Sequence, residues 1–222
     1  MTRVARVVVL FAKWPGRGRA KRRLARAIGS DGAARLARSF LQDTVALVAE
    51  SGSSRLVITY APPTARRHFA RLAPHAHLVA QPRGTFGTRL RSALAAGLAD
   101  GRRVALIGAD SPTLPPSRVR RAFAGLRTAD VALAPASDGG YVLIATRAAL
   151  PTSLFRRMPW STRRVMRETV RRAHQAGLRV AVLPAWYDVD DAAGLRRLRA
   201  DRRGMARARA TREALRAIGR NR

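Results

Sequence analysis

The chain has 222 residues, of which 47% are hydrophobic and 5% aromatic, enough to build a core of Ala, Val and Leu and too apolar for a disordered chain. There is no cysteine, which excludes disulfides, thiolate zinc sites and cysteine nucleophiles. The formal net charge is +31, but basic runs such as residues 17–26 contain no aromatic residue for base stacking. We therefore interpret the charge as mostly compositional, with weak nonspecific polyanion binding as a side effect.

The strands and helices that the sequence predicts alternate along the first part of the chain. Strands are expected at residues 3–12, 56–60, 76–80, 104–108 and 131–135, and helices at residues 30–50, 62–72, 88–99 and 116–126. A strand at 141–146, a helix at 161–175 and a strand at 180–183 follow. Residues 196–222 predict one or two Arg-rich helices interrupted at Gly204.

This alternation predicts an α/β fold, a three-layer αβα sandwich with a mostly parallel central sheet. Ligands of such sheets bind beyond the carboxyl ends of the strands, where the candidate residues below are found. The apolar run of residues 7–12 is too short for a signal peptide, and no stretch is long enough to span a bilayer. A cytoplasmic protein is expected.

A glycine-containing basic loop follows the first predicted strand. Such a turn lets backbone N–H groups approach phosphate oxygens, and lysine adds a compact charge that arginine does not replace in a tight pocket. Lys13 and Lys21, the only lysines of the chain, both fall in this loop. The loop is neither a P-loop nor a Rossmann fingerprint. It predicts phosphate binding by Lys13, Gly16, Gly18, Lys21 and Arg23; the alternative is a basic surface turn.

Acidic residues follow the later predicted strands. Asp110 comes after the strand at 104–108, and one or two carboxylates together with substrate phosphates are a usual way to hold Mg²⁺. The alternative for Asp110 is a helix cap. Asp188 and Asp190 lie on one side of an extended segment, where either a metal ion or nearby arginines would balance their charge. The sequence Asp138-Gly139-Gly140 is a further candidate, or an ordinary tight turn.

Two other kinds of site are not supported. His75 and His77 could ligate a metal, but no third ligand is in view, so exposed histidines are expected. Neither a Gly-x-Ser-x-Gly motif nor a plausible Ser-His-Asp set is present, which argues against covalent hydrolase chemistry.

Seven short segments taken in order carry a family resemblance over about residues 7–198. They are the Phe-Ala-Lys-x-Pro opening at 11–15 with Lys21-x-Arg-Leu24, Phe40-Leu-x-Asp43, Gln81…Gly87-x-Arg89, Gly108-x-Asp-x-Pro112, Asp138-Gly-Gly-Tyr141, Pro159-Trp-Ser-Thr162 and Asp188-Val-Asp190. In this combination the chain resembles a bacterial family of GT-A fold nucleotide-diphospho-sugar transferases, called glycosyltransferase-like, that is related to the phospholactate and molybdopterin guanylyltransferases.

The resemblance implies roles for particular residues. Asp110 and Asp190 would hold Mg²⁺ or Mn²⁺, and Lys21 and Asp110 would be catalytic. The nucleotide phosphates would be bound by the basic loop with Gln81 and Arg89. The substrate would be bound by Asp138, Gly139, Gly140, Trp160 and Ser161. Residues 1–198 would form a single nucleotide-binding transferase domain, followed by an Arg-rich helical tail at residues 199–222.

The expected function is Mg²⁺-dependent glycosyl transfer from a nucleotide sugar to a small-molecule acceptor. An alternative is nucleotidyl transfer from a nucleoside triphosphate to a small phosphorylated acceptor, with release of pyrophosphate; the lysine-bearing loop suits this chemistry. A third hypothesis is a non-catalytic polyanion-binding protein driven by the net charge of +31.

Overall fold

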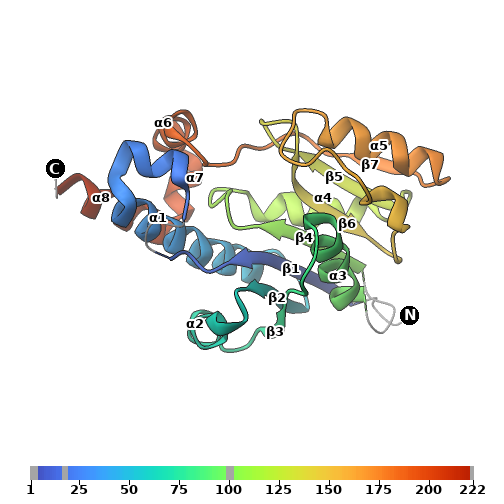
Figure 1. Cartoon of the computed structure of the whole chain (residues 1–222), viewed down its shortest axis with the longest axis horizontal. Helices are drawn as coiled ribbons and strands as arrows, with labels where there is room; N and C mark the ends of the chain where they lie inside the picture. The colour runs from blue at the N-terminus through green and yellow to red at the C-terminus, as the bar shows by residue number, and fades with distance from the viewer. Residues whose placement is uncertain (1–4, 17–19, 99–102, 221–222) are drawn as a thin grey trace.

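The computed structural model describes residues 5–16, 20–98 and 103–220, which fold around one mixed sheet of seven strands (Figure 1). The strand order is β3-β2-β1-β4-β6-β5-β7. The strands are β1 (Arg6–Lys13), β2 (Arg55–Ala61), β3 (His77–Ala80), β4 (Arg103–Gly108), β5 (Val131–Pro135), β6 (Tyr141–Thr146) and β7 (Val180–Val182).

The direction of the strands confirms the predicted α/β fold with a mostly parallel sheet. Among the described strands only β6 is antiparallel, to β4 on one side and β5 on the other. The carboxyl ends of the other strands therefore share one edge, and β6 begins at that edge. The β5–β6 hairpin consequently places its turn beside the loops that follow β1 and β4.

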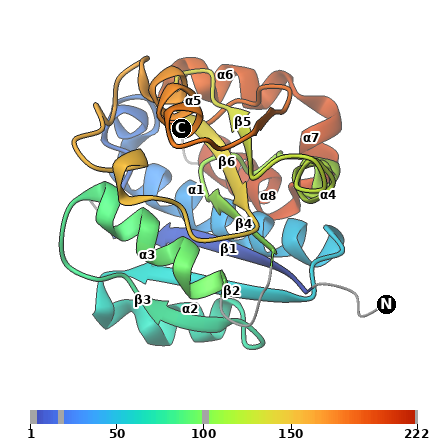
Figure 2. The same cartoon turned by 90° about the vertical axis from the view of Figure 1, so that its right-hand side faces the viewer.

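Helices cover both faces of the sheet (Figure 2). One face carries α1 (Arg22–Glu50), α2 (Arg66–Leu72) and α4 (Pro116–Gly125), and the other α3 (Phe86–Leu98) and α5 (Val165–Gln175). Strand β1 is buried on both sides: Val7 and Val9 pack in the α3 layer, and Val8 and Leu10 in the α1 layer. This two-sided burial explains its continuous apolar sequence.

Helix α1 begins earlier than the sequence predicts. Gly29, with φ 74° and ψ 160°, separates residues 22–28 from the predicted helix at 30–50. The first segment is helical because Leu24 and Ile28 are buried against Leu195 and Leu198, far along the chain. The loop expected over these residues is therefore wrong beyond Lys21, and a distant hydrophobic contact is the reason.

Three C-terminal helices lie beside α1, namely α6 (Ala192–Ala200), α7 (Arg202–Arg207) and α8 (Arg209–Arg220) (Figure 1). The Asp43 carboxylate of α1 accepts hydrogen bonds from the N–H groups of Ala210 and Thr211, at 3.0 and 2.8 Å, and so fixes the start of α8. The predicted interruption at Gly204 is wrong, since Gly204 lies inside α7. The helices are instead separated at Asp201 and Ala208.

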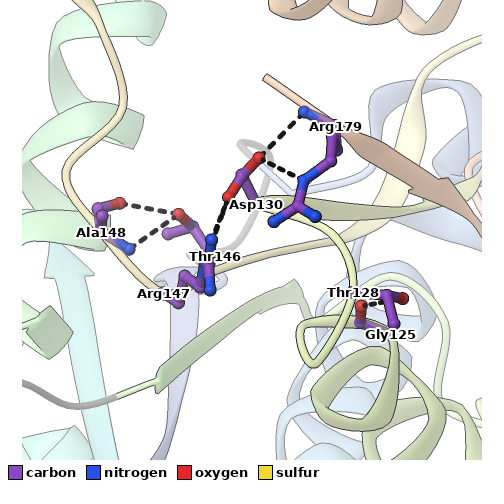
Figure 3. A network of polar contacts seen from close by, with 7 residues as sticks. All are labelled: Gly125, Thr128, Asp130, Thr146, Arg147, Ala148 and Arg179. Atoms are coloured by element: carbon purple, nitrogen blue, oxygen red, sulfur yellow. Dashed lines mark hydrogen bonds and ion pairs between the residues drawn. The ribbon is translucent and has the colours of Figure 1, made fainter. Parts of the chain in front are cut away.

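A network of charged residues stabilises the edge of the sheet at which the parallel strands begin (Figure 3). Asp130, just before β5, accepts hydrogen bonds from the backbone N–H of Arg179 at 3.0 Å and from Arg147 Nη2 at 2.5 Å. These contacts hold the pKa of Asp130 well below its usual range, those from Arg179 having the largest effect. They tie β7 and the end of β6 to β5. None of the helices in the described ranges is long and apolar enough to cross a membrane.

Candidate functional site

A cavity of about 810 Å³ opens at the edge of the sheet where the parallel strands end. Its wall is built from the ends of β1 and β4, the loop into α1, the start of α3, the β5–β6 turn and the segment before α6. The charged side chains that line it are Lys13, Lys21, Arg22, Arg23, Arg89, Asp110, Asp138, Asp188 and Asp190.

The centre of the site is an ammonium group held between two carboxylates. Lys21 Nζ lies 2.6 Å from Asp110 Oδ1 and 2.5 Å from Asp190 Oδ1, so residues 80 positions apart converge on one point. The Lys21 side chain is only 10% exposed. Burial lowers the pKa of Lys21, but the two carboxylate charges and the hydrogen bonds to them outweigh burial and raise the pKa above 10.5.

Backbone contacts fix the two carboxylates relative to each other. Val189 N donates to the Asp110 carbonyl at 2.8 Å, and Ser111 Oγ donates to the Tyr187 carbonyl at 2.8 Å. The segment that carries Asp190 is therefore held by two hydrogen bonds to the turn that carries Asp110. Arg23 adds a longer contact, with Nη2 at 3.6 Å from Asp190 Oδ2.

Asp188 faces the same cavity without a cationic partner in the described structure. Burial, together with the negative charges of Asp190, Asp138 and Asp110, raises the pKa of Asp188 to about 6. Asp138 lies on the β5–β6 turn, where its Oδ1 accepts from Gly140 N at 2.9 Å. This part of the cavity is accordingly acidic.

Gln81 and Arg89 form the wall on the β1–β2 side. Gln81 Nε2 donates to the carbonyls of Ala12 at 3.1 Å and Thr59 at 2.8 Å, so its amide joins the ends of two strands. Arg89 Nη1 donates to Gln81 Oε1 at 3.4 Å. Among the described residues the buried Arg89 Nε atom finds no hydrogen-bond partner, although Arg89 lines the cavity.

Aromatic rings form one wall of the site, and of these the sequence predicted Trp160 but not Phe86 or Phe11. Phe86 is 40% exposed at the start of α3, and its ring meets Phe11 edge-on at 5.6 Å and Trp160 at 4.8 Å between centroids. The following Gly87 packs so tightly that a Cβ would lie 2.5 Å from the Phe155 carbonyl oxygen. The sequence predicted the helix to begin at residue 88, so Phe86 was placed in the preceding loop and was not considered as a site residue.

The residues expected from the sequence are mostly gathered around this cavity. Its lining includes Lys13, Lys21, Arg23, Gln81, Arg89, Asp110, Asp138, Gly140, Trp160, Ser161 and Asp190. Gly16 and Gly139 do not line it, and Gly18 lies outside the described residues. Gly139, with φ 92°, instead packs where a Cβ would be 2.4 Å from the Arg163 Cα. His75 and His77 are exposed.

The site fits a divalent cation in one specific sense. Two carboxylate oxygens already converge on a single positive group, the ammonium of Lys21, which marks the position where a cation would be held. Within the described ranges no group of three or more His, Asp or Glu side chains is close enough to form a metal cage. Two carboxylates would therefore supply only part of the coordination of such an ion, as is usual for Mg²⁺.

The sheet order defines an α/β fold, and the likeness to a solved structure described below identifies it as the nucleotide-diphospho-sugar transferase fold and the molecule as a transferase. Residues 44–162 match the model of the DUF2064 family, described as an uncharacterized protein conserved in bacteria, and the chain belongs to this family. Together with the first solved structure below, this match confirms the expected relationship to the nucleotide-diphospho-sugar transferases. The comparison with curated proteins gives no match.

Three solved structures are similar. A "putative nucleotide-diphospho-sugar transferase" from Desulfovibrio desulfuricans G20 is 32% identical, with 96% of this chain and 97% of that chain covered and a TM-score of 0.84. A nucleotidyl transferase from Methanothermobacter is 16% identical, with coverage of 88% and 96% and a TM-score of 0.61. Rv0371c from Mycobacterium tuberculosis, in complex with manganese, is 18% identical, with coverage of 88% and 98% and a TM-score of 0.54.

Proposed function

We propose that the chain is a divalent-metal-dependent glycosyltransferase that moves a sugar from a nucleotide diphosphate donor to a small hydroxylated acceptor. The observation that carries the proposal is the Lys21 ammonium between Asp110 and Asp190, in the lining of a cavity with one basic and one acidic part. The relative that is 32% identical supports the same class.

The donor diphosphate is assigned to the basic part. Lys13, Lys21, Arg23 and Arg89 lie around it, and the unpartnered Nε of Arg89 is a further donor for a phosphate or carbonyl oxygen. Charge-assisted contacts of this kind are stronger than neutral hydrogen bonds. They stabilise the nucleoside diphosphate as negative charge builds on it during departure.

Asp110 and Asp190 are the residues that would hold the metal. When bound, Mg²⁺ or Mn²⁺ would neutralise the diphosphate and assist its departure as a Lewis acid. The manganese complex of a protein with the same fold makes this chemistry a reasonable assignment. Lys21 would contribute its charge to the phosphates rather than to the two carboxylates.

The acceptor is assigned to the part of the cavity with Asp138, Asp188, Trp160 and Ser161. Carboxylates accept hydrogen bonds from hydroxyl groups, and an aromatic ring packs against the flat apolar face of a sugar. A carboxylate here is also in position to take the proton of an attacking hydroxyl. The same carboxylates repel an acceptor phosphate, which is the reason to prefer glycosyl over nucleotidyl transfer.

Nucleotidyl transfer is the second candidate, because a lysine-bearing loop directly after β1 suits a triphosphate. The two chemistries differ in their products. We would incubate the protein with nucleotide sugars and, separately, with nucleoside triphosphates in Mg²⁺ or Mn²⁺, and identify products by mass spectrometry. Release of nucleoside diphosphate supports glycosyl transfer, and release of pyrophosphate supports the second candidate.

Matched variants test whether the products come from this site. Asp110→Asn and Asp190→Asn remove the proposed metal carboxylates, and we expect either to abolish turnover. Asp130→Asn removes a carboxylate that is also bound by arginines, but at the opposite edge of the sheet, and it should leave turnover unchanged. Full activity of Asp110→Asn and Asp190→Asn would contradict the proposed function.

A further inference from the structure

The segment that carries Asp190 is irregular backbone between β7 and α6, and side-chain contacts add to the backbone hydrogen bonds that hold it. The Tyr187 side chain makes one group of these contacts. Tyr187 is 4% exposed, and its hydroxyl accepts from Thr113 Oγ1 at 2.6 Å and donates to Asp201 Oδ2 at 2.7 Å. Tyr187 thereby joins the turn after Asp110 to the junction between α6 and α7.

Asp201 completes the junction from the other side. Its second oxygen, Oδ1, accepts from Gly204 N at 2.8 Å and caps α7. Gly204 is required for this approach, because a Cβ there would lie 2.2 Å from Asp201 Oδ2 and 2.5 Å from Thr113 Cβ. The hydrogen bonds from Tyr187 and Gly204 outweigh the effect of burial and lower the pKa of Asp201.

Helix α6 rests on the same segment. Asp191 caps it by accepting from Gly194 N at 2.9 Å, directly after Asp190. A Cβ at Gly194 would lie 2.9 Å from the Asp188 carbonyl oxygen and 3.0 Å from Val189 Cα. The guanidinium of Arg197 lies 4.5 Å from the centre of the Tyr187 ring. Helix α6 and the start of α7 therefore pack against the segment that ends in Asp190.

From this arrangement we propose that Tyr187 and Asp201 are positioning residues that hold Asp190 opposite Asp110, so that the C-terminal helices are part of the metal site. The inference rests on the metal site of the proposed function. Removal of the Tyr187 hydroxyl would leave the Thr113 hydroxyl and one Asp201 oxygen without their buried hydrogen-bond partner. We expect the neighbouring backbone, which carries Asp190, to shift in response. Outer contacts of this kind control affinity for a metal through the groups that ligate it.

The test is Mn²⁺ affinity of the full chain, measured by the electron paramagnetic resonance signal of free Mn²⁺, without substrate. We expect Tyr187→Phe and Asp201→Ala to weaken Mn²⁺ binding about tenfold. Asp201→Asn should recover most of the affinity, because its single side-chain oxygen can still accept from Gly204 N while its NH2 group donates to the Tyr187 hydroxyl. Because the readout is binding, a change in turnover alone would not be mistaken for this effect.

Asp43→Asn is the matched control, because Asp43 fixes the same group of helices through α8 without contact to Tyr187 or Asp201. It should lower the melting temperature but leave Mn²⁺ affinity unchanged. Suppose that Asp190→Asn weakens Mn²⁺ binding, as the metal site requires. Wild-type affinity in both Tyr187→Phe and Asp201→Ala, or an equal loss of affinity in Asp43→Asn, would then overturn the inference and leave the metal site in place. If Asp190→Asn binds Mn²⁺ like the wild type, the metal site itself is wrong and the inference falls with it.

Discussion

Replacement of Lys21 by methionine should have opposite effects on metal and nucleotide. In the ligand-free molecule the Lys21 ammonium is the cation between Asp110 and Asp190, so a divalent ion must displace it. Methionine keeps an unbranched side chain one atom shorter than lysine and removes the charge. We therefore expect Lys21→Met to bind Mn²⁺ more tightly than the wild type when no nucleotide is present, and to bind a nucleotide less tightly.

The magnitude follows from the two ion pairs. Asp110 and Asp190 side chains are 54% and 33% exposed, so solvent screening reduces each pair to about 1 kcal/mol. Loss of both corresponds to roughly a tenfold to thirtyfold gain in Mn²⁺ affinity. Loss of one charge-assisted contact to phosphate costs about 1.5–3 kcal/mol, so nucleotide affinity should fall by roughly tenfold to a hundredfold.

Calorimetric titration with Mn²⁺ and, separately, with nucleoside diphosphates measures both effects. Arg23→Met is the matched control for the metal, because Arg23 is 67% exposed and 3.6 Å from Asp190, and its removal should change Mn²⁺ affinity little. Arg207→Ala, in the exposed part of α7, is the control for diffuse attraction of nucleotide. Mn²⁺ affinity in Lys21→Met equal to or below that of the wild type would refute the displacement argument.

Three further outcomes are expected. Hydrogen bonds from Arg171 and Arg172 lower the pKa of Glu168 to about 2, so its stabilising contribution is complete above the usual pKa of 4.5 and is lost as pH falls towards 2; Glu168→Gln should flatten acid unfolding followed by circular dichroism. Gly139→Ala combines a positive φ with a 2.4 Å contact to Arg163 and should destabilise the fold by about 1–3 kcal/mol in urea titrations, whereas no loss would mean that the turn relaxes freely. Binding of duplex and single-stranded oligonucleotides should be weak, independent of sequence and steeply reduced by salt, and tight sequence-dependent binding at physiological salt would favour a nucleic-acid-binding protein.

The sequence predicted the central strands of the sheet well because they are buried on both faces, which leaves a continuous apolar pattern such as Val7–Leu10. The meeting of Asp110 and Asp190 could be expected from topology alone, since both follow strands that end at one edge of the sheet. The position of Asp138 beside the cavity could be expected for the same reason, because Asp138 follows the predicted strand at 131–135. Their chemical roles remain predictions.

Contacts between distant segments could not be predicted. The helix at residues 22–28 forms because Leu24 and Ile28 meet the C-terminal helices, and no local signal announces that partner. The helix break at Asp201 depends on the Asp201 carboxylate, which accepts from the Tyr187 hydroxyl. The break at Ala208 depends on the Asp43 carboxylate of α1, which accepts from Ala210 N. A division of the chain at residue 198 would separate the members of both pairs, so we expect a chain that ends at Leu198 to fold poorly.

The distribution of lysine gives the molecule a built-in chemical reporter. Amine-reactive reagents modify lysine side chains and the α-amino group but not arginine, and both lysines of the chain line the cavity. Lys13 is exposed, while Lys21 is shielded and kept protonated by its two carboxylates, so Lys13 should be acylated much faster. Peptide mass mapping after brief acylation would then follow the environment of each amine separately, and any compound that protects Lys13 or uncovers Lys21 would be detected as a ligand of the cavity without knowledge of the reaction.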